Sequence, residues 1–415
     1  MASSPAPLGV LRGHVDSVVS LRFDGHARLL SGSADGCLKI WSLHSLRCEA
    51  TVQAHDRSVL SINTLGDLQV ATSGRDRTVK IWDRAALGGG GGGRAGAFPV
   101  PVRVLACGSD HFSNAATQQR ADSLLLAAPG LEQQEVLLWD LRSHAPATTL
   151  QPTGGGDKAG MVTSLAFAPA ECAPCAVLLA GYEDGCLYAF DARRPDCAVC
   201  VLKLHSEPVF ALAVSSCPEY ESKGAGAGTG TAGADTAGAG TGAWSMVLQA
   251  AGSVSLKQPG TSCARYRSDG RLLASAHWDC SVRIFDRKRL KPLAILRQHR
   301  ESVYAVDFAD APPHCTNAPE AAVEARAEAA EAEAEGGAET GAEGEAAAEA
   351  EAAERGADVF RLSASSSASA FTGLSHSVGG VGGTGSLFAT GSKDHTVAVW
   401  DLFASSYVHP HPHSH

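Results

Sequence analysis

Histidine, aspartate and tryptophan recur along this chain at intervals that could support acid–base chemistry. His55 is followed 21 residues later by Asp76, and Trp82 stands six residues beyond that aspartate. The same order, broken in the last set by a long insert, links His14, Asp35 and Trp41, and then His299, Asp394 and Trp400. Serine or threonine precedes each aspartate, so every set holds the residue types of a Ser-His-Asp proton relay.

These sets have two interpretations, one catalytic and one structural. A catalytic relay is recognised by geometry and role, and an active site is not copied several times within one molecule. A structural network can be copied, because every buried carboxylate must be hydrogen-bonded or it costs several kcal/mol. We therefore expect His14, His55 and His299 to be buried and bonded near Asp35, Asp76 and Asp394, respectively. We expect no catalytic residue and no cofactor.

The elements that position these residues form a repeat. Five residues separate an aspartate from an aromatic residue in SGSADGCLKIW, TSGRDRTVKIW, AGYEDGCLYAF, SAHWDCSVRIF and TGSKDHTVAVW, and residues 135–141 keep EVLLWDL. Segments such as SVVSLRF (17–23) have the β-branched, alternating character of strands. Trp41 and Trp82 lie 41 residues apart, within the roughly 40–45-residue period of a WD-repeat blade. The pattern predicts an all-β WD40 β-propeller over residues 8–403.

Three segments have compositions that cannot offset the entropy of ordering, and we expect them to be disordered inserts. Residues 84–98 are Gly-rich, residues 218–243 are Gly/Ala/Thr-rich, and residues 310–385 are acidic and Ala/Glu-rich, then Ser/Gly-rich. A His/Pro tail at 404–415 is also expected to be disordered. Without the inserts about 298 residues remain, or about 43 for each of seven blades, so the sequence predicts seven.

The fifth blade and the ends of the ring are expected to be unusual. Only 14 residues, 245–258, separate Trp244 from a Pro-Gly turn, whereas three strands need about 20 or more. Blade five is therefore either incomplete or missing a piece. Residues 8–12 resemble the outer strand of a blade, and the last unit ends at 400–402 without one. We expect the first segment to complete the last blade and close the ring.

Four cysteines have spacing that could bind zinc. Cys172 and Cys175 form one C-x2-C pair, and Cys197 and Cys200 form another 21 residues later, which is near zinc-ribbon spacing. Both pairs are expected in loops on one face of the same blade, so they could meet. Against a metal site, a blade needs no metal to fold and cysteine is frequent throughout this chain. The commitment is therefore to no metal, with zinc as the alternative.

Charge and cysteine usage limit the classes of partner. Residues 318–358 carry a net charge of −11 out of −10 for the whole chain, so the rest is close to neutral. No clustered basic surface suggests direct nucleic-acid binding, and no apolar run of 18 residues suggests a membrane span. The start MASSPAPLGV lacks the features of a secretory signal. The 12 scattered cysteines favour reduced thiols in the nucleus or cytoplasm.

Several strings are more specific than a general WD repeat. LLAGYEDGCLYAFDARRP at 178–195, residues 272–308 with SAHWDCSVRIFDRKRL, and LFATGSKDHTVAVWDL at 387–402 resemble one family. It is the family of guanine nucleotide-binding protein subunit beta-like protein 1, whose fungal members are called ASTRA-associated protein 1. The similarity runs, with gaps at the inserts, from about Val10 to Phe403. The inserts and the short fifth blade depart from it.

The resemblance implies a scaffold of the nucleus and cytoplasm that is tied to the ASTRA assembly. That assembly is linked to chromatin remodelling and to the co-chaperone system that matures phosphatidylinositol-3-kinase-related kinases. The resemblance implies protein partners and no catalytic residue. The family name suggests G-protein signalling, but a true β-subunit carries an N-terminal helix for its γ partner. Only 10 residues precede the first repeat unit here, so no γ subunit is expected.

A second function is suggested by WDLR at 139–142, with FDAR at 190–193 as a looser copy. The W-D-x-R pattern occurs in propellers that serve as substrate receptors of cullin-type ubiquitin ligases. The alternative is that Arg142 is simply a polar residue at the end of a strand. Co-purification with the cullin adaptor would separate this function from the scaffold.

The residue before each turn aspartate is expected beside the channel, on the face that carries these turns. The predicted partner-binding residues are Arg75, Glu183, Trp278 and Lys393, with Tyr182 one position earlier and Arg57 and Glu301 two residues after a turn histidine. A tryptophan at a turn tip has little core to pack against, and Trp, Tyr and Arg are enriched in binding hot spots. We predict that Trp278, with Arg75 and Lys393 around it, anchors a protein partner. The alternative is that Trp278 packs on a neighbouring blade.

Overall fold

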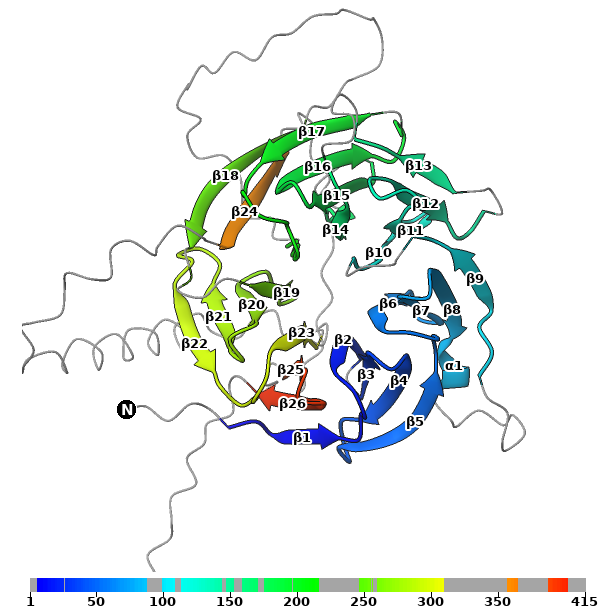
Figure 1. Ribbon diagram of the computed structural model, residues 1–415, viewed down its shortest axis with the longest axis vertical. Coiled ribbons are helices and arrows are strands. Elements are labelled where there is room, and N and C mark those ends of the chain that lie inside the picture. Colours follow the sequence, from blue (N-terminus) through cyan, green and yellow to red (C-terminus); the bar gives the residue numbers. More distant parts are fainter. Residues whose placement is uncertain are drawn as a thin grey trace, which may run out of the picture.

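The computed structural model shows antiparallel sheets arranged as a ring around a central channel (Figure 1). It describes residues 6–25, 27–87, 99–108, 113–143, 147–152, 159–170, 175–195, 197–215, 246–254, 256, 260–309, 357–364 and 387–401. Six sheets have four strands each, and a seventh sheet has two. The propeller predicted from the repeat is therefore present.

The six four-stranded sheets are blades, each running from an inner strand beside the channel to an outer strand (Figure 1). In ring order they are β2 (Val18–Asp24), β3 (Arg28–Ser33), β4 (Cys37–Ser42) and β5 (Arg47–Gln53); β6 (Val59–Leu65), β7 (Gln69–Gly74), β8 (Thr78–Asp83) and β9 (Arg103–Ala106); β10 (Ala116–Gln119), β11 (Leu124–Pro129), β12 (Val136–Asp140) and β13 (Thr148–Leu150); β14 (Val162–Phe167), β15 (Val177–Tyr182), β16 (Cys186–Asp191) and β17 (Ala198–Lys203); β19 (Thr261–Tyr266), β20 (Leu272–His277), β21 (Val282–Asp286) and β22 (Pro292–Leu296); and β23 (Val303–Phe308), β25 (Leu387–Ser392), β26 (Thr396–Asp401) and β1 (Gly9–Arg12).

The prediction of seven blades is wrong, because the described residues form six. Between the blade of β14–β17 and the blade of β19–β22, the chain contributes residues 208–215 without strand pairing. It also contributes β18 (Met246–Val254), which pairs only with β24 (Ala357–Ala364). The physical reason is the one that made blade five doubtful: too few residues separate 244 from 260 to build three strands.

Two of the predicted inserts contain regular structure. Strand β24 lies inside 310–385, and the α-helix α1 (Arg84–Leu87) opens 84–98 with Leu87 buried. The rest of these two inserts, the whole of 218–243 and the tail at 404–415 lie outside the described residues. Within the described ranges, no helix has the length and apolar character needed to cross a bilayer.

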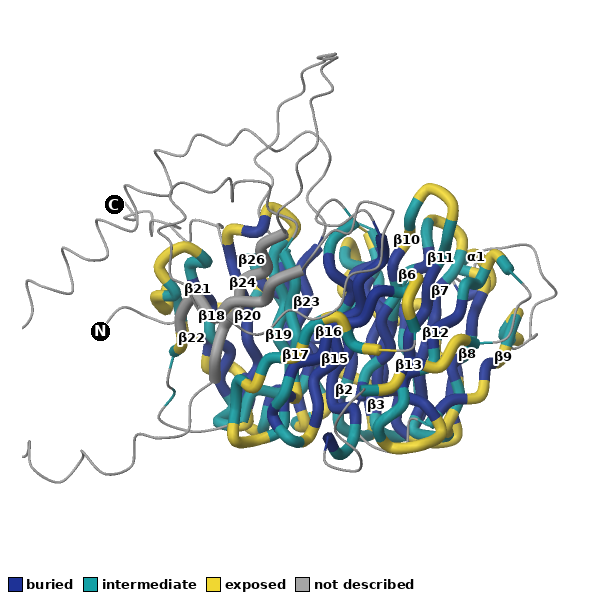
Figure 2. Tube along the Cα trace, turned by 90° about the horizontal axis from the view of Figure 1, so that it is seen from above, coloured by how far each residue is buried: buried dark blue, intermediate teal, exposed yellow. Residues whose placement is uncertain are grey.

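The core lies between neighbouring blades and depends on small residues in the second strand of each sheet. β3 reads RLLSGS, and all of its residues except the first are buried. A Cβ at Gly32 would lie 2.4 Å from the Ser20 hydroxyl and 2.6 Å from Val59 of the next blade, so only glycine permits this approach. Figure 2 shows the exposed residues concentrated in the turns at the ends of the strands.

The ring closes through the first strand, as the sequence predicts. β1 pairs antiparallel with β26, with Leu11 opposite Val397, and the Leu8 amide donates to the Val399 carbonyl at 2.7 Å. Leu11 is 2% exposed. The pairing covers the outer edge of β26 that the last repeat unit would otherwise leave open.

Candidate protein-interaction site

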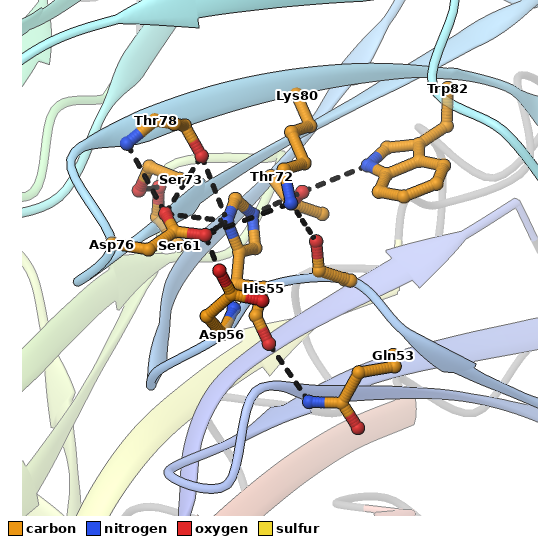
Figure 3. Close-up of polar contacts among 11 residues, drawn as sticks. Gln53, His55, Asp56, Ser61, Thr72, Ser73, Asp76, Thr78, Lys80 and Trp82 are labelled. Atoms are coloured by element: carbon orange, nitrogen blue, oxygen red, sulfur yellow. Dashed lines mark hydrogen bonds and ion pairs between the residues drawn. The ribbon is translucent and has the colours of Figure 1, made fainter.

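The predicted histidine network is complete in blade two, where four side chains meet (Figure 3). His55 Nδ1 lies 2.9 Å from Asp76 Oδ1, and its Nε2 lies 2.8 Å from Thr72 Oγ1. The indole N–H of Trp82 donates to the same Thr72 hydroxyl at 2.9 Å, and the Thr78 hydroxyl donates to Asp76 at 2.7 Å. Each buried polar group thus satisfies the next one.

The electrostatics of Asp76 fit a structural role. Burial by itself raises the pKa of this carboxyl, but hydrogen bonds from His55 and Thr78 outweigh burial and hold the pKa well below its ordinary value. Thr72, the only hydroxyl bonded to His55 Nε2, is fully buried. A nucleophile enclosed in this way cannot reach a substrate, so the geometry supports the structural interpretation of the set.

Blade seven repeats the network across the long insert. His299 Nδ1 lies 3.0 Å from Asp394, 95 residues later in the chain, and its Nε2 lies 2.8 Å from the Thr390 hydroxyl. Trp400 Nε1 donates to Thr390 at 3.1 Å, and Thr396 supports the carboxylate at 2.6 Å. The predicted pairing of His299 with Asp394 is confirmed.

Blade one departs from the prediction. His14 is buried and its Nε2 meets the Ser31 hydroxyl at 2.6 Å, which also accepts from Trp41 at 2.7 Å. Asp35, however, accepts from the Cys37 amide at 2.9 Å, while His14 Nδ1 is buried without a hydrogen-bond partner. Burial, reinforced by Lys39, lowers the pKa of His14 to about 4. The expected bond between His14 and Asp35 is therefore wrong.

Blade six carries a histidine that the sequence analysis missed. His277 stands two residues before Asp279, inside β20, and its Nε2 lies 2.7 Å from the Ser275 hydroxyl. It thus bonds the second-strand hydroxyl that the turn histidine contacts in other blades. Burial, with Arg283 next, lowers the pKa of His277 to about 4. The signal was present in the string SAHWD, but the search used only the 21-residue interval.

The exposed residues gather on the top face, which we define as the end of the ring carrying the turns at Asp35, Asp76, Asp279 and Asp394. A channel of about 1490 Å³ opens there, and Trp278, Arg75 and Arg57 all line it. Trp278 is 48% exposed. Both predicted arginines therefore lie on the channel that the tryptophan borders.

Trp278 is held in place by its neighbours although it is exposed. Its amide donates to the Gly260 carbonyl at 3.0 Å, and its own carbonyl accepts from the Ser302 hydroxyl at 3.0 Å. A Cβ on Gly260, whose φ is +112°, would lie 2.3 Å from the indole, so glycine is needed beneath the ring. The tryptophan has a fixed position over the channel instead of extending freely into solvent.

Phe210 is a second aromatic residue at this site, and the sequence analysis did not single it out. It is 37% exposed, and its ring centroid lies 6.0 Å from that of Trp278 at an angle of 53°. Aromatic pairs at this separation favour tilted geometry. Phe210 was missed because blade five loses its repeat pattern directly after it, so no interval assigned it a face.

The other predicted partner-binding residues divide into exposed and buried. Lys393 pairs with Glu301 at 3.2 Å, and both side chains are about half exposed, but neither is among the residues that line the channel. Glu183 is exposed and accepts from the Met161 amide at 3.3 Å. Tyr182 is fully buried and donates to the Gln134 carbonyl, so its assignment to a partner-binding surface is wrong.

Neither of the two alternative motifs forms a recognisable site among the described residues. Cys172 lies outside them, and Cys175, Cys197 and Cys200 belong to no group of three metal-binding side chains within the described ranges. Burial, followed by a hydrogen bond with Asp191, raises the pKa of the Cys175 thiol to about 11, which disfavours the thiolate that zinc requires. In WDLR, the Arg142 guanidinium donates to the Ala121 carbonyl at 2.7 Å.

Comparison with known proteins agrees with the repeat and with its extent. The profile described as "WD domain, G-beta repeat" matches residues 5–42, 46–83, 255–286 and 367–401. The chain is 31% identical over 318 residues to guanine nucleotide-binding protein subunit beta-like protein 1 of Mus musculus, covering 74% of this chain and 90% of the relative.

Two fungal relatives carry the other family name. "ASTRA-associated protein 1" of Verticillium alfalfae is 29% identical, with 78% of this chain and 82% of the relative covered. The protein of the same name from Schizosaccharomyces pombe is 24% identical, with 73% and 93% covered. The similarity therefore extends over most of each relative instead of a single repeat.

Proposed function

This chain belongs to the family of guanine nucleotide-binding protein subunit beta-like protein 1, and on that premise we propose that it is a non-enzymatic scaffold for protein complexes. The name of the fungal relatives supports the ASTRA assembly as its complex, with chromatin remodelling and kinase maturation as the processes served. The nucleus and cytoplasm are the compartments we propose. Protein partners fit a ring whose polar networks are buried and whose aromatic residues are exposed.

The observation that carries this proposal is the exposed aromatic pair over the channel. Trp278 and Phe210 leave 48% and 37% of their surfaces accessible, although large aromatic residues usually contribute to a core. Tryptophan beside arginine is a composition enriched in binding hot spots, and Arg75 lines the same channel. Lys393 and Glu301 add a charged pair on the same face.

The test is affinity capture of partners by the full chain and by Trp278→Ala, followed by mass spectrometry. We expect the variant to bind its captured partner at least about 2 kcal/mol more weakly, or roughly 30-fold, as for a hot spot. Its thermal midpoint should stay close to that of the parent. Leu68→Ala is the matched control, because Leu68 is 77% exposed in the turn between β6 and β7, at the other end of the strands.

The identity of the captured proteins decides between functions. Recovery of kinase-maturation co-chaperones supports the scaffold, whereas recovery of a cullin adaptor that depends on Arg142 supports the ligase receptor. If Trp278→Ala captures its partners at full strength, or if it melts early, the tryptophan serves packing alone and the top-face assignment is wrong.

A further inference from the structure

Residues 208–215 occupy the place of an inner strand between the blade of β14–β17 and the blade of β19–β22. The hydroxyls of Thr163 and Ser164 donate to the Val209 carbonyl at 2.7 and 2.5 Å. In blade one, Ser20 donates in the same way to the carbonyl of Val59, at the start of β6, at 2.9 Å. This segment is therefore anchored to the preceding blade as an inner strand is.

The segment differs from every inner strand in having no second strand beside it. β2, β6, β10, β14, β19 and β23 each pair with the next strand of their own sheet. Within the described chain, no sheet includes residues 208–215, and no hydrogen bond joins the backbone of residues 210–214 to another described residue. Backbone amides and carbonyls are obligatory hydrogen-bonding groups, so this edge is an acceptor for a strand.

The burial pattern shows that this part of the ring is open. Residues 210–215 are half-buried or exposed, and β19, the next inner strand around the ring, is half-buried throughout. β2 and β23 are mostly buried in comparison. Leu212 and Val214 pack against the cluster that includes Leu179, so one side of the segment is fixed to its neighbour.

We propose that residues 208–215 bind one extended strand of a partner protein, which pairs with them antiparallel as the missing second strand. The strands that fill this position in other blades define its chemistry, because they are nearly all buried and rich in small uncharged residues: SGS in β3, ATSG in β7, ASAH in β20 and ATGS in β25. The partner strand is accordingly uncharged and small, with alternating apolar residues.

The chain's own strands in this sector are engaged with each other. β18 pairs with β24 from Met246 opposite Ala364 to Val254 opposite Ala357. A strand from another protein is therefore the occupant that the pairing leaves room for. This inference relies on the proposed function only in taking the partner to be a protein. The acceptor edge is a separate contact from Trp278, although Phe210 joins the two sites.

The test titrates the full chain against a fluorescent peptide that copies residues 387–394, LFATGSKD, the second strand of blade seven. Two further peptides carry N-methyl groups on alternate residues, so that each loses the amides on one edge. We expect saturable binding of the parent peptide. One methylated peptide should bind at least tenfold more weakly and the other about equally, because only one edge of the peptide pairs. Trp278→Ala should change peptide affinity less than threefold, even where it abolishes partner capture.

Four results would overturn the acceptor edge. They are no binding of any peptide, equal binding of both methylated peptides, peptide binding that appears only after deletion of 357–364, and light-scattering masses that show self-association at the concentrations used. The second result means adhesion by side chains alone. The third means that the chain's own strand occupies the edge, and the fourth assigns the edge to a second copy.

Discussion

Blades one and two share the same intervals of histidine, aspartate and tryptophan, yet only blade two closes its network. In blade two His55 bridges Asp76 and Thr72, whereas in blade one Asp35 turns away from His14. The residue two positions after the aspartate separates the two cases. Blade two has Thr78 there, and its hydroxyl donates to Asp76 at 2.7 Å.

Blade one has Cys37 at that position, and blade seven supports the same rule. The Cys37 thiol points to Gln53 Oε1 at 3.1 Å, whereas Thr396 of blade seven donates to Asp394 at 2.6 Å. A thiol is a weak donor, so Asp35 lacks the contact that would hold it toward the histidine. Spacing brings the three side chains near one another, but a fourth residue decides whether they bond.

The largest expected effect is the acid sensitivity of the incomplete blade. The pKa of His14 falls to about 4 in the folded state, below the ordinary value of about 6.5. The unfolded chain therefore binds the proton first, and stability present above pH 6.5 is lost as the pH falls to 4. The loss amounts to about 3 kcal/mol, at about 1.4 kcal/mol per pKa unit.

Urea unfolding of the parent and of His14→Gln between pH 7 and pH 4 measures this loss. The stability difference between the two proteins should narrow as the solution is acidified, since glutamine does not titrate. If the difference is the same at both ends of the range, His14 is already charged in the folded protein and the comparison of the two blades fails.

Removing the aspartate should cost more in the complete network than in the incomplete one. Asp76→Ala leaves His55 Nδ1 and the Thr78 hydroxyl without their acceptor, which should lower the free energy of unfolding by about 1–3 kcal/mol. Asp35→Ala, the matched control, loses the bond from the Cys37 amide and should cost about 0.5–1.5 kcal/mol. Chemical denaturation of both variants checks the order, and equal costs would show that closure of the network adds nothing.

The smallest effect is a gain. Cys37→Thr places in blade one the hydroxyl that supports the carboxylate in blades two and seven. We expect Asp35 to turn toward His14 and the protein to gain about 1 kcal/mol, the net value of one hydrogen bond. An NMR titration should then show the pKa of His14 above the parent value. A variant whose His14 titrates unchanged would remove Cys37 as the cause.

The repeat intervals predicted the strands, the closure of the ring and two of the three histidine pairs, because these features follow from local spacing. Seven blades failed because the count divided total length evenly, whereas pairing requires enough consecutive residues at each place. Tyr182 failed because successive residues of a strand alternate in facing. A position next to an exposed turn residue can therefore be fully buried.

His277 and Phe210 were beyond the same reasoning for different causes. His277 reaches its serine from within a strand, so no fixed interval to a turn marks it. Phe210 owes its exposure to a missing neighbour, which is a property of the assembled ring instead of the local sequence. Both lie where one blade departs from the repeat.

The pairing of β1 with β26 sets a timetable for synthesis. β1 leaves the ribosome among the first residues, but Val399, opposite Gly9, is made about 390 residues later. At about 5–20 residues per second, β1 waits roughly 20–80 s for its partner. Until then the last blade lacks its outer strand and the ring stays open, so the nascent chain presents β1 to any molecule that can hold a strand. Release of the finished chain and closure of the ring are consequently coupled in time, and a pause late in translation prolongs the vulnerable state.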